Sequence, residues 1–199
     1  MTSRIVLATH NPHKVEEFAA IVAATRPDIE VVGYDGPEPV EDGTTFADNA
    51  LIKARAACAH TGLPALADDS GICVDVLGGA PGVFSAYWAG HRKDARANLD
   101  LLLDQLADIA DPHRSAQFVS TIALVRPDGT HTVVEGTWPG RLAREASGGG
   151  GFGYDPIFIP NGQPAGAERT VGEWSADEKN ADSHRARAFT ALAPLLEAL

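Results

Sequence analysis

Cysteine, positive charge and long apolar runs are all scarce in this chain of 199 residues. Its two cysteines, Cys58 and Cys73, form no CxxC pair and are too few for a disulfide framework, so we expect two buried thiols. The 16 Lys and Arg residues stand against 27 Asp and Glu residues, which leaves a formal net charge of −11. This balance argues against nucleic-acid polymers and anionic membranes as partners, whereas a small phosphorylated ligand needs only a few local cations.

Several patterns that mark common classes of protein are missing. No apolar run approaches the roughly 18–20 residues of a membrane span, and the segment from Met1 has no signal-peptide core, so we expect a cytoplasmic protein. There is no H-E-x-x-H motif and no zinc-ligand spacing of histidines with cysteines. No G-x-S-x-G motif suggests an esterase, and no Gly-Lys-Ser/Thr marks a Walker loop.

Hydrophobic periodicity and turn residues divide the chain into short strands and amphipathic helices. We expect strands at 4–9, 29–32, 117–125, 131–138 and 154–159, and two strands within 65–77 that are separated by a tight turn at 68–71. Pro127-Asp-Gly129 predicts a β-hairpin between the strands at 117–125 and 131–138. Helices are expected after the Asn11-Pro12 turn, from about Thr45 to His60, over 98–107 and from Ser183 to the C-terminus. This order predicts an α/β protein with a mixed central sheet flanked by helices, and the length predicts one domain, residues 1–199.

The first candidate site is the turn from Asn11 to Lys14, where a strand ends and a helix begins. Backbone N–H groups and the positive end of a helix dipole converge at such a turn, and Lys14 adds a full charge. The pattern fits a phosphate-binding turn, but it fits an ordinary turn with a surface lysine as well. Asn49 and Lys53 lie four residues apart on one helix face, where a solvated lysine is again the alternative.

A second candidate site is the adjacent pair Asp68-Asp69, which follows a short apolar run and precedes Ser70-Gly71. Neighbouring carboxylates repel one another unless a cation or a proton relieves them, and Mg²⁺ prefers carboxylate oxygens together with substrate phosphates. Glu41 in the acidic loop can supply a further oxygen. The competing interpretation is a simple turn, because Asp, Ser and Gly all favour turns.

The glycine-rich segment 148–153 contains G-x-G-x-x-G, but Tyr154-Asp-Pro156 follows it, so no dinucleotide-binding helix can begin there. A mobile loop is the plain interpretation. Phe152 within this loop could instead stack on a planar base. Lys179 and Ser183-His184-Arg185 gather donors near the last helix, where a surface charge cluster is the alternative.

Taken together, these segments resemble the non-canonical purine nucleoside triphosphate pyrophosphatases, the inosine/xanthosine triphosphate pyrophosphatase family. The resemblance follows the chain in order and rests on these segments: Val6–Lys14, Glu41–Ala50, Leu66–Gly71, Leu77–Ser85, Gly150–Pro156, Glu178–Asn180 and Ser183–Arg185. It implies a mixed α/β fold of two lobes with the active site in the cleft between them, and a homodimer. It also implies Mg²⁺-dependent hydrolysis of dITP, ITP or XTP to the monophosphate and pyrophosphate.

The same resemblance implies a role for individual residues. Asp69 would be the general base and a metal ligand, with Glu41 and Asp68 around the ion. Phe152 would stack on the base, and His184 or Arg185 would donate a hydrogen bond to O6 of a 6-keto purine, which adenine cannot accept. The full set of implied substrate-binding residues is Thr9, His10, Asn11, Pro12, His13, Lys14, Lys53, Ser70, Phe152, Gly153, Tyr154, Asp155, Lys179, His184 and Arg185.

Two functions from other classes are compatible with parts of the pattern. Asp69-Ser70-Gly71 is the D-S-G triplet of aspartic peptidases, but it occurs once, so a dimer partner would have to supply the second aspartate. A nucleotide-binding module without turnover is the other alternative. Product analysis with ITP separates the three, because only the pyrophosphatase releases IMP.

Overall fold

The computed structural model describes residues 3–196, and the side chain of His13 lies outside its described part. The strands are β1 (Ser3–Leu7), β2 (Ile29–Gly33), β3 (Ala65–Val74), β4 (Ser115–Val125), β5 (His131–Leu142) and β6 (Phe158–Pro160). The α-helices are α1 (Pro12–Thr25), α2 (Phe46–Thr61), α3 (Ala95–Gln105), α4 (Ala176–Asp182) and α5 (His184–Leu192). Short 3-10 helices lie at Asp75–Leu77, Gly82–Tyr87, Asp155–Ile157, Val171–Glu173 and Ala193–Leu196.

The strands form one six-stranded sheet in the order β2-β1-β3-β4-β5-β6. β1 pairs in parallel with β2 and with β3, whereas β5 and β6 are antiparallel. β4 and β5 are joined by the hairpin expected at 126–130, where Arg126 N donates to Thr130 O over 2.9 Å and Gly129 has a φ of 86°. The predicted α/β fold with a mixed sheet flanked by helices is therefore confirmed.

The contacts divide the chain into two compact units. Unit 1 consists of Met1–Asp69, Ser120–Gly136 and His184–Leu199, and unit 2 of Ser70–Val119 and Thr137–Ser183. β3, β4 and β5 each contribute residues to both units. No α-helix within residues 3–196 is long and apolar enough to cross a membrane.

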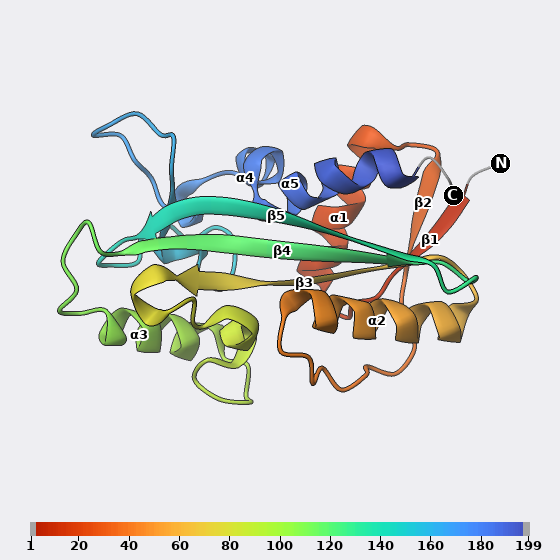
Figure 1. Cartoon of the computed structure of the whole chain (residues 1–199). Helices are drawn as coiled ribbons and strands as arrows, with labels where there is room; N and C mark the ends of the chain where they lie inside the picture. The colour runs from red at the N-terminus through yellow and green to blue at the C-terminus, as the bar shows by residue number, and fades with distance from the viewer. Residues whose placement is uncertain (1–2, 197–199) are drawn as a thin grey trace. The chain divides into compact units, whose positions relative to one another are not determined.

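Unit 1 has apolar clusters on both faces of its strands because side chains alternate along β1. Ile5 and Leu7 join a cluster with Phe18 of α1 and Phe189 of α5. Val6 points to the other face and joins a second cluster, which is rich in alanine and includes Ala50, Ala54 and Ala57 of α2. Figure 1 shows α1 and α5 on one face of these strands and α2 on the opposite face.

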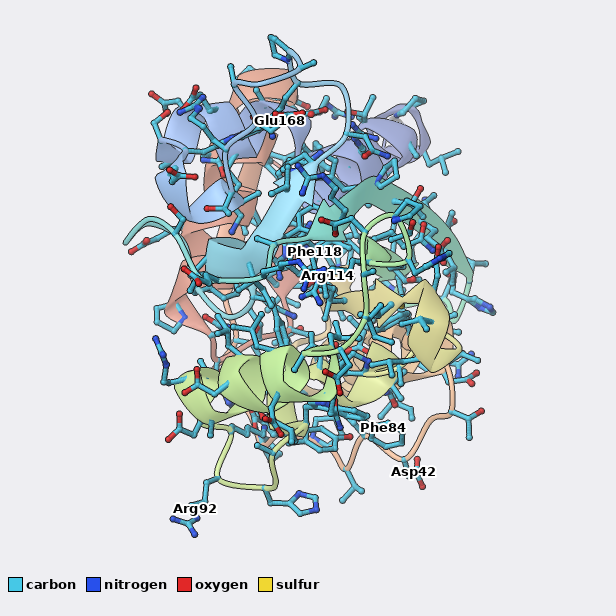
Figure 2. The ribbon with its side chains drawn as sticks, turned by 90° about the vertical axis from the view of Figure 1, so that its left-hand side faces the viewer. Asp42, Phe84, Arg92, Arg114, Phe118 and Glu168 are labelled. Carbon is cyan, nitrogen blue, oxygen red and sulfur yellow. The ribbon has the colours of Figure 1, made fainter. Side chains whose placement is uncertain are left out.

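Unit 2 has a core of its own, in which the Phe118 ring meets the Phe158 ring edge to face at a centroid distance of 4.7 Å. Arg114 is buried in this unit and has 2% of its surface exposed. Its guanidinium donates to the carbonyl oxygens of Leu142, Leu106 and Ala143 over 3.0, 2.6 and 2.9 Å. In Figure 2 Arg114 and Phe118 lie in the interior, whereas Phe84 and Arg92 lie at the periphery.

The structure corrects four expectations about local structure. β3 is continuous through the expected turn at 68–71, because tertiary partners bind the Asp68 and Asp69 side chains that would otherwise bond to their own backbone. The expected strand 154–159 begins as a 3-10 helix, and only Phe158–Pro160 is extended. Ser183 ends the unpredicted helix α4 and does not open the last helix, which starts at His184. Cys58 is buried as expected, but Cys73 is only half-buried.

Candidate functional site

The turn between β1 and α1 has the geometry expected of a strand-to-helix site. Thr9 Oγ1 accepts a hydrogen bond from Asn11 N over 3.1 Å, and Asn11 O accepts one from Val15 N over 3.1 Å. Pro12 is the first residue of α1, where its missing N–H and its fixed φ cost nothing. Lys14 therefore lies in the first helical turn, at the positive end of the helix dipole.

Asp68 of β3 is the partner of the Lys14 side chain. Lys14 Nζ lies 2.8 Å from Asp68 Oδ2, and Arg185 Nε of α5 lies 3.3 Å from the same oxygen. Ser120 Oγ of β4 donates to Asp68 Oδ1 over 2.6 Å. Burial disfavours the ionised carboxylate, but Lys14 and Arg185 outweigh it and hold the pKa of Asp68 well below its usual range. Burial lowers the pKa of Lys14, although Asp68 opposes this effect.

Asp69, the next residue of β3, has its partners on α2. Lys53 Nζ lies 2.8 Å from Asp69 Oδ1, and Asn49 Nδ2 lies 3.4 Å from Asp69 Oδ2. These partners are one helical turn apart, so one face of α2 contacts both oxygens of the carboxylate. Burial raises the pKa of Asp69 despite the nearby ammonium. Burial works against the charge of Lys53, but the carboxylates of Asp69 and Glu41 raise its pKa.

Glu41, in the loop that precedes α2, also contacts Lys53. Its Oε2 lies 2.9 Å from Lys53 Nζ, so a single ammonium contacts both Glu41 and Asp69. Asn49 Oδ1 accepts a hydrogen bond from Gly43 N over 2.9 Å and closes this loop onto the helix. A Cβ at Gly43 would lie 2.6 Å from Asn49 Oδ1, so only glycine permits this close approach.

These carboxylates allow a test of whether the site suits a divalent cation. Glu41 and Asp69 converge on one cationic group and carry hard oxygen donors, which fit Mg²⁺. Asp68 is directed instead to Lys14, Ser120 and Arg185. Within the described residues no group of three or more His, Cys, Asp or Glu side chains forms a ready metal cage. The donor set therefore suits a cation that takes its other ligands from water and substrate.

His10 lies beside the acidic loop. Its ring stacks on Tyr34 at a centroid distance of 5.6 Å, and its Nδ1 lies 3.1 Å from Glu38 Oε1. The side chain is 40% exposed. The other histidine of this turn, His13, belongs to α1, but its side chain lies outside the described residues.

Unit 2 carries a second group of the predicted residues, in and after the glycine-rich loop. Asp155 Oδ2 accepts hydrogen bonds from Phe152 N and from Lys179 Nζ, both over 2.8 Å. Lys179 Nζ lies 4.3 Å from the centre of the Phe152 ring, in a cation–π contact. Gly151 has a φ of 70°, and a Cβ there would collide with the Asp155 carboxylate. Asp155 thus fixes the loop, and Phe152 rests against a buried lysine.

The remaining predicted residues occupy varied positions. Tyr154 is buried, its hydroxyl donates to Ser85 O over 2.9 Å, and burial raises its pKa. Gly153 has a φ of 61°, which favours glycine in the turn before Tyr154. Ser70 is half-buried in β3. His184, like Arg185, is buried at the start of α5.

Two residues of unit 1 contact this site but were not among those expected there. Asn49 had a signal in the sequence, because it lies four residues before Lys53 on the same helix face. Ser120 had none, since 52 residues separate it from Asp68 and only the order of strands in the sheet brings β4 next to β3.

The fold and the site define an α/β protein in which the carboxylates of β3 and of the loop before α2 lie beside cations carried by helices. Comparison with known proteins gives the group within this class: the chain belongs to the Ham1 family, whose model matches residues 5–195. It is 63% identical over 196 residues to the dITP/XTP pyrophosphatase of Leifsonia xyli subsp. xyli, covering 98% of this chain and 96% of that protein.

Solved structures of the family agree with the fold. A HAM1 protein from Coxiella burnetii has a TM-score of 0.86 and 39% identity, covering 99% of this chain and 100% of that one. The nucleoside-triphosphatase / dITP/XTP pyrophosphatase from Mycobacterium abscessus has a TM-score of 0.76 and 48% identity, covering 96% and 99%.

Proposed function

We propose that this protein hydrolyses non-canonical purine nucleoside triphosphates, dITP, ITP and XTP, to the monophosphate and pyrophosphate. The observation that carries the proposal is the meeting of Glu41, Lys53 and Asp69 in unit 1, next to the Lys14–Asp68 pair. Such a set binds a polyphosphate and can activate water. Relatives that match this chain almost end to end carry the name dITP/XTP pyrophosphatase. Removal of deaminated purines from the nucleotide pool is the cellular role that follows.

The phosphate end of the substrate is assigned to unit 1. Lys14 and the backbone N–H groups at the start of α1 bind the triphosphate, with Thr9 and Asn11 shaping the turn. Lys53 holds Asp69 and Glu41 in place and offsets phosphate charge. Asp69 accepts a proton from the attacking water, because Lys53 and Asn49 hold its two carboxylate oxygens in a fixed orientation.

Mg²⁺ is the proposed cofactor, and Glu41 and Asp69 are the residues that would hold it. When bound, it would neutralise charge on the phosphate oxygens and lower the pKa of a coordinated water. Attack at the α-phosphorus then breaks its bond to the oxygen that bridges to the β-phosphorus. Pyrophosphate leaves, and the water's oxygen stays on the monophosphate.

The base is assigned to the glycine-loop residues of unit 2. Phe152, held by Asp155 and Lys179, offers an aromatic face on which a purine can stack. A donor to O6, from His184 or Arg185, would favour 6-keto purines over adenine, because the amino group of adenine leaves that donor unpaired. A homodimer and a cytoplasmic location complete the proposal.

The two alternatives are less well supported. In the peptidase hypothesis Asp69 would need a second aspartate, whereas its carboxylate binds Lys53 and Asn49. A binding module without turnover leaves the water-activating carboxylates unused. Neither explains the names of the relatives.

Incubation with dITP, ITP, XTP, GTP and ATP in Mg²⁺, followed by product analysis, tests the proposal. We expect monophosphate and pyrophosphate from the first three at rates far above those for GTP and ATP. Release of orthophosphate and a diphosphate would contradict the cleavage site, and binding without products would support the binding module. Replacement of Mg²⁺ by EDTA is expected to abolish turnover.

A further inference from the structure

Both carboxylate oxygens of Asp68 are engaged by protein donors. Oδ1 accepts the hydroxyl of Ser120, and Oδ2 accepts Lys14 Nζ and Arg185 Nε. The side chains of Asp68 and Arg185 are 1% and 3% exposed, and Ser120 is fully buried. The side chains of Asp69 and Glu41, by contrast, are 13% and 40% exposed. Asp68 is therefore the most buried of the three acids that the sequence suggests as metal ligands.

Lys14 is the member of this group that reaches the surface. Its side chain is 16% exposed, against 3% for Arg185 and 1% for Asp68. Its ammonium lies 2.8 Å from Asp68 Oδ2 and 3.4 Å from the Asp68 backbone oxygen, so one residue of β3 contacts it twice. The direction of the lysine is thus set by Asp68.

We propose that Asp68 is a positioning residue and not a metal ligand. Ser120 and Arg185 hold its carboxylate from within the unit, and Asp68 in turn holds the Lys14 ammonium toward the polyphosphate. The inference rests on the proposed function only in naming a polyphosphate as the partner of Lys14. It adds Ser120, a residue of β4, to those that the reaction depends on.

The charges of Lys14, Arg185 and Asp68 predict how a bound polyanion changes the stability of an Asp68 variant. Two cations, Lys14 and Arg185, share one buried carboxylate. Replacing Asp68 by asparagine keeps the shape but leaves two enclosed positive charges without that counterion, which destabilises the fold. A polyanion bound at Lys14 then relieves the repulsion, so it stabilises the variant more than it stabilises the wild type.

The experiment measures melting temperature with and without inorganic pyrophosphate in EDTA, which needs neither metal nor turnover. Asp68→Asn is expected to melt lower than the wild type and to gain at least about twice the wild-type increase on addition of pyrophosphate. Ser120→Ala keeps every charge and loses only the orienting donor. In Mg²⁺ it is expected to lower kcat/KM for dITP by about 3- to 10-fold, through KM.

A matched control comes from the next residue of β4. Thr121 is 2% exposed, and its hydroxyl lies 3.4 Å from Glu135 Oε2, so Thr121→Val also removes a buried hydroxyl. Because neighbouring strand residues face opposite sides of the sheet, this variant is expected to leave KM and the pyrophosphate response unchanged. An equal rise of KM in Thr121→Val would overturn the assignment of Ser120.

The Mg²⁺ dependence separates positioning from metal binding. In Asp68→Asn and Ser120→Ala the Mg²⁺ concentration for half-maximal rate is expected to stay within about twofold of the wild-type value. Loss of a residue that holds the metal, or that orients one of its ligands, would raise it by about tenfold or more. A tenfold rise with a wild-type pyrophosphate response would show that Asp68 acts on the metal and not on Lys14, and would overturn the proposal. Should Asp68→Asn not fold, Ser120→Ala decides: a wild-type KM for dITP in this variant would overturn the proposal. A wild type that pyrophosphate stabilises but that does not cleave dITP would contradict the proposed function and leave the inference standing.

Discussion

Lys53 Nζ lies 2.8 Å from Asp69 Oδ1, which joins the third turn of α2 to the middle of β3. The same ammonium lies 2.9 Å from Glu41 Oε2. One side chain thus draws two acids from distant segments into one place, where like charges would otherwise repel.

Asp69→Asn removes the proposed base and keeps the shape of the side chain. We expect kcat for dITP to fall by about 10²- to 10⁴-fold, the usual contribution of general base catalysis. Binding of dITP in EDTA, where metal coordination plays no part, is expected by calorimetry to remain within about tenfold of wild type, because Lys14 and Phe152 are untouched. Retained turnover would place the base elsewhere.

Asn49→Asp separates the two hydrogen bonds of the Asn49 side chain. The aspartate still accepts from Gly43 N, but it loses the donor to Asp69 and adds a like charge. We expect a lower melting temperature in EDTA, because the new buried carboxylate repels Asp69, and a kcat lowered about tenfold, since each factor of ten corresponds to roughly 1.4 kcal/mol of the barrier. Unchanged turnover would limit Asn49 to closing the loop.

Asn98→Ala is the control for Asn49. Asn98 is another buried asparagine, on α3, whose side chain accepts from Ala89 N and donates to Ala86 O over 2.6 and 2.9 Å. Its loss is expected to lower the melting temperature by several degrees and to leave kcat unchanged. A fall in kcat here would show that loss of stability alone explains the Asn49 result.

Phe152→Leu tests the aromatic face in the glycine-rich loop. Stacking of a base on an aromatic ring is worth about 1–3 kcal/mol, so KM for dITP is expected to rise about 5- to 100-fold, with a smaller change in kcat. Phe152→Tyr retains the ring and is expected to stay near wild type. Phe84→Leu removes a ring that is 53% exposed and serves as the control. Similar KM values for Phe152→Leu and wild type would remove Phe152 from the base site.

Arg114→Met tests a structural role in unit 2. The substitution fills similar volume but removes donors from the carbonyl oxygens of Leu142, Leu106 and Ala143. Buried acceptors left without donors cost about 1–3 kcal/mol each, so we expect a loss of roughly 3–5 kcal/mol in urea unfolding. Arg144→Met, at an exposed neighbour, is expected to change stability by less than about 0.5 kcal/mol. A small effect at Arg114 would mean that water replaces the guanidinium.

Glu178→Gln tests the pH dependence of stability near α4. A hydrogen bond from Arg169 Nη2, 2.6 Å from Glu178 Oε1, lowers the pKa of Glu178 from 4.5 to about 2. Because the folded protein holds the ionised form, this contribution is present above pH 4.5 and is lost as the pH falls toward 2. The melting temperature of the variant is expected to depend less on pH in that window. An unchanged slope would assign acid sensitivity to other carboxylates.

Local sequence determined the elements whose signals are local. Thr45 and Asp48 predicted the start of α2, where Thr45 Oγ1 accepts from Asp48 N, and Gly62 ends the helix with a φ of 68°. The hairpin at Pro127-Asp-Gly129 and the turn before α1 were predicted for the same reason: backbone sterics and short-range hydrogen bonds act within a few residues. The acids, lysines and glycine loop of the candidate site were also visible there.

Only the tertiary structure decided what those residues contact. Asp68, Asp69 and Ser70 favour a turn by composition, yet they lie in a continuous strand, because Lys14, Lys53, Ser120 and Arg185 bind the two carboxylates from other segments. The separate roles of Asp68 and Asp69 follow from their opposite directions on that strand. The reason is physical: a buried charge is stabilised by partners that the fold supplies, and these partners lie up to 117 residues away in the sequence.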